Sequence, residues 1–149
     1  MKTILRRSSV LVCLCVFLPY SGFVHAQRVE WETLSKEVTR LDNQGRYSQA
    51  FQVAEKALDV AARNFAENDV RVAASLSNLG AIHFRQGNYP EALKFYLRGL
   101  KIQRLQPNPN NSEISGLLNS IGAVYLAMGK YRDAENMFED SLYLRERLK

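Results

Sequence analysis

Few side chains in this sequence could do chemistry once residues 1–26 are set aside. His83 is then the only histidine, and both cysteines, Cys13 and Cys15, lie within residues 1–26. Nucleophilic catalysis by a histidine needs a serine, a cysteine or a second histidine placed to share a proton with it. None is placed so beside His83, and one histidine cannot form a zinc site alone. We therefore expect no catalytic residues, no metal site and no cofactor.

The acidic residues near the C-terminus suggest a surface rather than a site. They fall at helical spacings, with basic residues three to five positions away: Asp133, Glu135, Glu139 and Asp140. Such spacing is typical of a solvated helix face with ion pairs along it. No phosphate-binding loop, dinucleotide fingerprint or zinc-ligand spacing occurs in the sequence. The sequence therefore indicates that the protein is not an enzyme.

Residues 1–26 have the pattern of a secretion signal. Lys2, Arg6 and Arg7 precede an unbroken apolar run at residues 10–18 (VLVCLCVFL), which Pro19 ends. Small residues then stand where a signal peptidase cleaves, up to Ala26. The alternative is a retained membrane anchor, but crossing a bilayer takes about 20 apolar residues and this run is shorter. We expect general secretion, cleavage near Ala26, no stable membrane span afterwards, and a location in the periplasm or outside the cell.

The overall charge is misleading until the signal is removed. The whole chain has 20 Lys and Arg, 15 Asp and Glu, and a formal charge of +5. Without the three basic residues of the signal, 17 basic residues face 15 acidic ones, a balance of about +2. A strongly basic domain is the usual electrostatic mark of nucleic-acid binding. We therefore expect no nucleic-acid partner.

The rest of the chain repeats with a period of 42 residues. The columns that keep this spacing are Gly45, Gly87 and Gly129; Tyr47, Tyr89 and Tyr131; Ala50, Ala92 and Ala134; Leu34, Leu76 and Leu118; Leu58, Leu100 and Leu142. A period of this length is typical of stacked structural repeats. Within each unit, apolar residues recur at three- and four-residue spacing on either side of the glycine, which indicates two helices. Each unit is therefore predicted to be a helical hairpin.

Residue size supports close packing of the two helices in a unit. Gly87 stands where a left-handed residue would end the first helix, and Pro90 stands where a fixed φ would begin the second. Gly80 and Gly122 on the first helices leave room for large side chains such as Tyr96 on the second. His83 falls in the aromatic column beside Gly80, so we expect it to pack rather than react.

The segments SLSNLGAIHFRQGNYPEALKFYLRGL and GLLNSIGAVYLAMGKYRDAENMFEDSL resemble the tetratricopeptide repeat, in the 42-residue variant of kinesin light chains and of many exported bacterial proteins. The resemblance implies an all-α fold, a right-handed α-solenoid of three hairpins behind the signal peptide. The domain would span residues 27–149, with repeats at about 31–72, 73–114 and 115–149.

The first unit and the joints depart from the regular pattern. Val38, Leu41 and Ala54 replace a glycine and two aromatics, and Trp31 is added at the front. Since terminal repeats are usually atypical, this unit is interpreted as the N-terminal end of the stack. Between hairpins, the predicted N-caps are Asn68 or Asp69 for the second unit and Asn111 or Ser112 for the third.

The resemblance also implies a concave groove that the first helix of each unit lines. Positions that alternate with the packing stripe carry the predicted contacts: Lys36, Ser77, Asn78, Phe84, Arg85 and Asn119. The amides of Asn78 and Asn119 suit the unpaired main chain of an extended ligand, and Arg85 or Lys36 could pair with a carboxylate. The alternative is that these polar side chains are only solvated.

These observations favour a scaffold or adaptor in the cell envelope that binds a partner protein or an extended peptide. The alternative is the N-terminal sensory or docking part of a larger exported protein, such as a caspase-like protease or a sensor kinase. Because Lys149 falls just after the second helix of the third unit, we expect no extra polar helix to cover the last hairpin. An apolar face around Val124, Phe138 and Leu142 would then allow a homo-oligomer.

Overall fold

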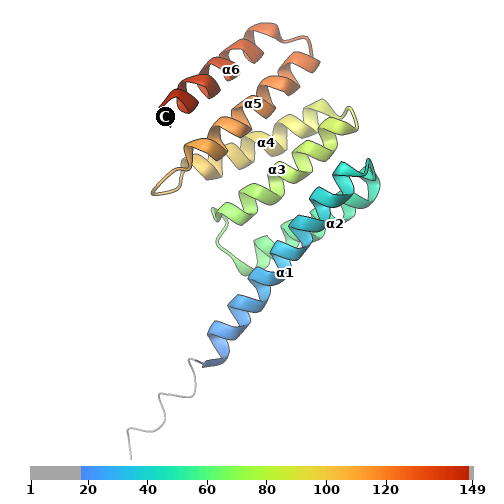
Figure 1. Cartoon of the computed structure of the whole chain (residues 1–149), viewed down its shortest axis with the longest axis vertical. Helices are drawn as coiled ribbons and strands as arrows, with labels where there is room; N and C mark the ends of the chain where they lie inside the picture. Colours follow the sequence, from blue (N-terminus) through green and yellow to red (C-terminus); the bar gives the residue numbers. More distant parts are fainter. Residues whose placement is uncertain (1–17, 148–149) are drawn as a thin grey trace, which may run out of the picture.

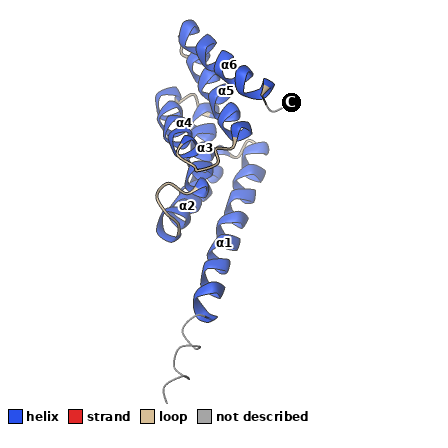
Figure 2. Cartoon of the chain, turned by 90° about the vertical axis from the view of Figure 1, so that its left-hand side faces the viewer, coloured by secondary structure: helices blue, strands red, loops and turns tan. Residues whose placement is uncertain are grey.

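The computed structural model describes residues 18–147 and consists there of six helices joined by short turns. The helices are α1 (Leu18–Asn43), α2 (Tyr47–Asn64), α3 (Val70–Arg85), α4 (Tyr89–Arg104), α5 (Asn111–Ala127) and α6 (Tyr131–Glu146). Consecutive helices form three antiparallel hairpins that stack on one another (Figure 1). In the described part of the chain all regular structure is helical (Figure 2). The all-α solenoid predicted from the repeat is confirmed.

A glycine with positive φ ends the first helix of every hairpin. Gly45, Gly87 and Gly129 have φ values of 70°, 78° and 73°. After Gly87, the amide of Asn88 donates to the carbonyl of His83 at 2.8 Å, and the same bond recurs in the other two turns. Glycine adopts this left-handed conformation without steric cost. The 42-residue glycine column therefore marks the three tight turns.

The first helices of the second and third hairpins begin at side-chain caps. Asp69 accepts a hydrogen bond from the amide of Arg71, so one of the two predicted caps is correct. At α5 the cap is Asn110, whose side-chain oxygen Oδ1 accepts from the amides of Ser112 and Glu113. The prediction of Asn111 or Ser112 is wrong, because α5 begins at Asn111 and both residues lie inside the helix.

Small residues let the paired helices approach closely. An ideal Cβ at Gly80 would lie 2.9 Å from Cδ1 of Tyr96. Ala50, Ala92 and Ala134, on the second helices, are all nearly inaccessible to solvent. The size alternation predicted from the sequence therefore lets the helices of the second and third hairpins pack closely.

Neighbouring hairpins join through both apolar packing and polar bridges. Buried side chains of α4 and α5 share one cluster, and Val72 and Leu76 of α3 share another with Ala61 of α2. The indole Nε1 of Trp31 donates to Oγ of Ser75 at 2.8 Å, which ties α1 to α3. Each hairpin therefore covers the apolar edge of the one before it.

The predicted signal segment lies mostly outside the described residues. Residues 1–17 are not described, and α1 begins at Leu18 with Pro19 in its first turn, where a missing amide is tolerated. From there α1 runs unbroken past Ala26, and its first half extends away from the other helices (Figure 2). Cleavage near Ala26 stays a prediction.

Candidate binding surface on the first helices

The first helices of the three hairpins lie next to one another. Helix α3 contacts α1 on one side and α5 on the other. These contacts are few, because most packing within the stack passes through the second helices. One face of α1, α3 and α5 therefore stays open along the stack, and the predicted groove residues stand on these helices.

Apart from Arg85, the predicted groove residues fall into three groups in the structure. Lys36 and Asn119 are exposed, each on its own helix. Asn78 is half-buried on α3. Ser77 and Phe84 are engaged within the fold. The Ser77 hydroxyl donates to the Ala73 carbonyl at 2.8 Å, and the Phe84 ring packs 5.7 Å from that of Tyr89.

Arg85 lies beside a carboxylate of the first hairpin. Its Nε is 3.8 Å from Oδ1 of Asp42, and the Arg85 side chain is about half exposed. Asp42 Oδ1 is itself buried and accepts no hydrogen bond within the described residues. Arg85 therefore already faces one carboxylate, so a ligand carboxylate would share it with Asp42.

The hydroxyl of Tyr96 lies beneath this part of the face. Burial raises the pKa of Tyr96, while a side-chain hydrogen bond with Ser120 and the charge of Arg85 lower it. The charge of Asp42 adds a smaller upward effect on the same pKa. Groups of α1, α3 and α5 thus lie close enough to Tyr96 on α4 to influence its pKa.

A hollow of about 430 Å³ opens at the other end of these helices. All three first helices line it, together with the end of α4: Arg28, Trp31, Glu32, Val70, Arg71, Ala74, Gln103, Asn110 and Glu113. None of these is among the six residues predicted from the sequence. The one available signal was Trp31, an aromatic added to the first unit with no counterpart in the other two.

The walls of the hollow are held by contacts within the chain. Arg71 pairs with Asp69 at 2.7 Å and lies 3.6 Å from the centroid of the Phe65 ring. The hydrogen bond from the Arg71 side chain holds the pKa of Asp69 below its usual range, although burial opposes this. Arg28 and Glu32 form a second pair at 3.5 Å. The charges at the rim are thus largely balanced.

The floor of the hollow is apolar, with one unsatisfied polar atom. Trp31 and Ala74 are half-buried, and Val70 is 43% exposed. Gln103 is nearly inaccessible, and its Oε1 accepts no hydrogen bond within residues 18–147. This arrangement can accommodate an apolar side chain.

The side chain of His83 is packed among aromatic rings of the neighbouring helices. His83 packs between two rings, at 5.3 Å from Phe95 and 5.4 Å from Phe51, as its aromatic column predicts. In the part of the chain that the structure describes, no three His, Cys, Asp or Glu side chains cluster as metal ligands would. Nor is any described helix both long and apolar enough to cross a bilayer.

Comparison with known proteins agrees with this architecture. A family model of the tetratricopeptide repeat matches residues 41–105 and 71–147. The fold is similar to that of BtubC (BKLC) from P. vanneervenii, with a TM-score of 0.73 and 22% identity over 79% of this chain and 47% of BtubC. It is similar to the TPR domain of Arabidopsis FLU, with a TM-score of 0.72 and 20% identity over 81% of this chain and 98% of that domain.

A third similar structure has nearly identical TPR-like repeats and is described as a kinesin light chain of Podospora anserina. The TM-score is 0.71, with 16% identity over 84% of this chain and 58% of the other. The chain thus spans about half the length of BtubC and of the Podospora protein. No curated protein matches the sequence.

Proposed function

This chain belongs to the tetratricopeptide repeat family, whose repeats bind protein partners, and we propose that it is a scaffold that holds an extended segment of a partner. The segment lies along the open face of α1, α3 and α5. Folds of this family are typically non-catalytic scaffolds, and the extended surface of stacked repeats is what they use to bind.

The observation that carries this proposal is the hollow between the first helices. It is the place where one ligand side chain would touch all three hairpins at once. Its apolar floor of Trp31, Val70 and Ala74 suits an aliphatic or aromatic side chain, and its paired charges leave little net attraction for a lone ion. An apolar pocket with a few placed polar groups is the usual form of a recognition site.

The remaining predicted residues extend this site along the face. The amides of Asn78 and Asn119 offer donors and acceptors to the main chain of an extended ligand. Lys36 is exposed and can pair with an acidic residue of the ligand. Such contacts would set the direction of the peptide, while the hollow anchors one side chain.

We also propose that the scaffold acts in the cell envelope, in the periplasm or outside the cell. Support comes from the sequence of residues 1–26, with its basic start, short apolar run and small residues before Gln27. The absence of cysteine after Cys15 is compatible with an oxidising compartment.

The binding proposal is tested with a phage-displayed library of random 12-residue peptides, selected against the chain from residue 27. We expect enrichment of peptides with one apolar anchor. Ala74→Arg fills the hollow and should abolish their capture, whereas Ala62→Arg, at an exposed position on α2, is the matched control and should not. Equal capture by both variants would place binding elsewhere.

The role of the amides is tested separately. Asn78→Ala combined with Asn119→Ala should weaken a selected peptide several-fold, because each lost hydrogen bond contributes about 0.5–1.5 kcal/mol. Trp31 is the only tryptophan, so its emission reports occupation of the hollow directly. If peptide binding left the Trp31 emission unchanged, the anchor would not be in the hollow.

The location is tested by fusing residues 1–26 to alkaline phosphatase, which is active only after export. We expect an active reporter in the envelope fraction, and N-terminal sequencing should find the exported chain starting near Gln27. An inactive reporter would refute export without affecting the binding proposal.

A further inference from the structure

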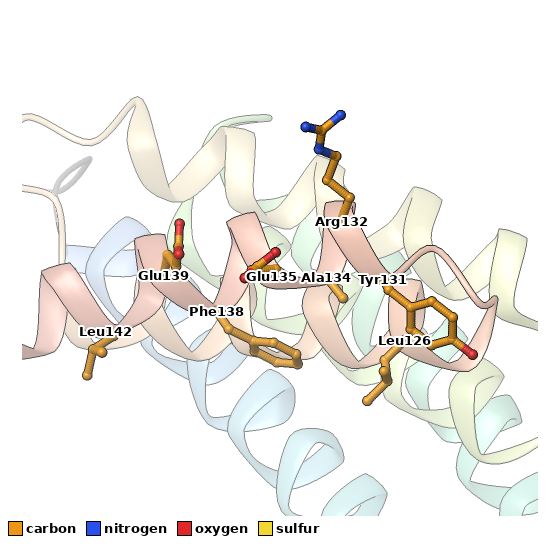
Figure 3. Close-up of a pocket in the computed structure, with 8 residues that line it drawn as sticks. All are labelled: Leu126, Tyr131, Arg132, Ala134, Glu135, Phe138, Glu139 and Leu142. Carbon is orange, nitrogen blue, oxygen red and sulfur yellow. The ribbon is translucent and has the colours of Figure 1, made fainter.

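The side of α6 that faces away from the second hairpin, here called the outer face of α6, forms with the end of α5 an apolar strip that no described residue covers. Leu126, Tyr131 and Leu142 are 51%, 71% and 58% exposed. Together with Phe138 and Ala134 they line a shallow hollow of about 690 Å³ (Figure 3). Large apolar side chains gathered on one exposed face usually mark an interaction surface.

The repeat shows what kind of element fits this face. Counted 42 residues back from Phe138 and Leu142, the same positions on α4 are Tyr96 and Leu100, which are buried against α5. Leu100 is only 5% exposed, against 58% for Leu142. The face of α6 is therefore built like one that, elsewhere in this chain, binds a helix.

Helix α5 shows the pattern that the bound helix uses. Its residues in the shared cluster include Ile114, Leu117, Leu118 and Ile121. These are aliphatic side chains at positions i, i+3, i+4 and i+7, which form one stripe along a helix. A helix with this stripe matches the strip on α6.

The residues beside the strip on α6 are charged, whereas the residues at the same repeat positions on α4 are apolar. Glu135 and Glu139 stand where α4 has Leu93 and Leu97. With Arg132, these two carboxylates are the charged residues that line the hollow, which gives its rim a net charge of −1. A complementary partner therefore presents basic side chains beside its aliphatic stripe.

A second copy of this chain matches the face poorly. Two α6 helices packed face to face would bring two acidic surfaces together, which is unfavourable. In a head-to-tail stack, α1 would sit on α6, but the positions of α1 that correspond to Ile114 and Ile121 carry Glu30 and Glu37. The sequence also predicts that Val124 belongs to a self-association face. That prediction is wrong, because Val124 is fully buried and cannot contact another molecule.

We propose that the outer face of α6 binds a basic amphipathic helix of a partner protein. The helix lies on α6 as α5 lies on α4, with aliphatic residues at i, i+3, i+4 and i+7. This surface is separate from the open face of α1, α3 and α5, so one scaffold can hold two different segments.

The test uses two synthetic peptides based on residues 110–127, the sequence of α5 with its cap. Both keep the aliphatic stripe, and the four exposed positions 112, 113, 116 and 119 are all lysine in one peptide and all glutamate in the other. Fluorescence anisotropy measures binding to the chain from residue 27. We expect the lysine peptide to bind at least about tenfold tighter.

Two protein variants and a control locate the site. Glu135→Lys with Glu139→Lys should invert the preference between the peptides. Leu126→Asn with Leu142→Asn should reduce binding of the lysine peptide at least about tenfold, since both side chains are exposed and the fold does not depend on them. The matched control replaces Leu97 and Leu105, two exposed leucines of the second hairpin, with Asn and should leave binding unchanged.

Several results would overturn the proposal. They are equal binding of the two peptides, no binding of either, or an equal loss in the Leu97→Asn, Leu105→Asn control. A dimer in light scattering that Leu142→Asn dissolves would also overturn it, by assigning the face to a second copy.

Discussion

The ring of Phe138 on α6 occupies the space that a side chain at Gly122 on α5 would need. An ideal Cβ at Gly122 would lie 2.7 Å from Cε1 of Phe138. The second hairpin repeats the pair with Gly80 and Tyr96. In the first hairpin the sizes are exchanged: Val38 on the first helix and Ala54 on the second are both buried in one cluster.

This relationship predicts opposite effects for two glycines of the same helix. Gly122→Ala should lower the free energy of unfolding by about 1–3 kcal/mol, because the ring of Phe138 must move. Gly116→Ala meets nothing within 4 Å and should raise it by about 0.5–1 kcal/mol, because alanine is the better helix former. Urea unfolding measures both, and equal effects would disprove the packing argument.

The cost of a substitution at a turn glycine should depend only on how readily the new residue adopts a positive φ. Gly87 has φ of +78° and open space around its Cα, so Gly87→Ala should cost about 1–2 kcal/mol from backbone strain. Gly87→Asn should cost less, because asparagine visits this region more readily. Thermal unfolding should give the stability order Gly, Asn, Ala. Alanine as stable as asparagine would contradict it.

The pKa of Asp69 predicts a pH-dependent contribution to stability. Because the Arg71 side chain lowers this pKa in the folded state, the stabilisation is present above the ordinary value of about 3.9 and is lost as the pH falls through the folded pKa. Asp69→Asn keeps a capping oxygen but loses the charge. The difference in unfolding free energy between wild type and Asp69→Asn should therefore shrink from pH 6 to pH 2.5.

A constant difference between those two pH values would show that the ion pair is not its source. Asn110→Ala serves as the control on α5. It should cost about 1 kcal/mol through loss of the cap, with little dependence on pH because Asn110 carries no charge.

The hydrogen bond from Trp31 to Ser75 should couple the first hairpin to the second. Trp31→Phe, Ser75→Ala and the double variant form a thermodynamic cycle. We expect a coupling energy of about 0.5–1.5 kcal/mol, the usual size for one hydrogen bond. Strictly additive losses would mean that the bond contributes nothing and that the two residues act through packing alone.

Features that depend on residues close in the chain were predictable from the sequence. Gly87 requires a turn because of its own backbone, and Gly80 lies only sixteen positions from Tyr96 within one hairpin. The turn glycine recurs in all three units and the Gly80–Tyr96 pair recurs as Gly122–Phe138, both at a 42-residue spacing, so the periodic sequence repeats each local pattern. The three hairpins and their helix pairing followed for this reason.

Features that depend on how the hairpins stack came only from the tertiary structure. The hollow joins Arg28 of α1 to Glu113 of α5, and no local pattern indicates that these residues meet, because the angle between successive hairpins decides it. The same stacking buries Val124 and leaves Leu142 exposed. A repeat specifies each unit, but the packing of one unit on the next determines which positions face a partner.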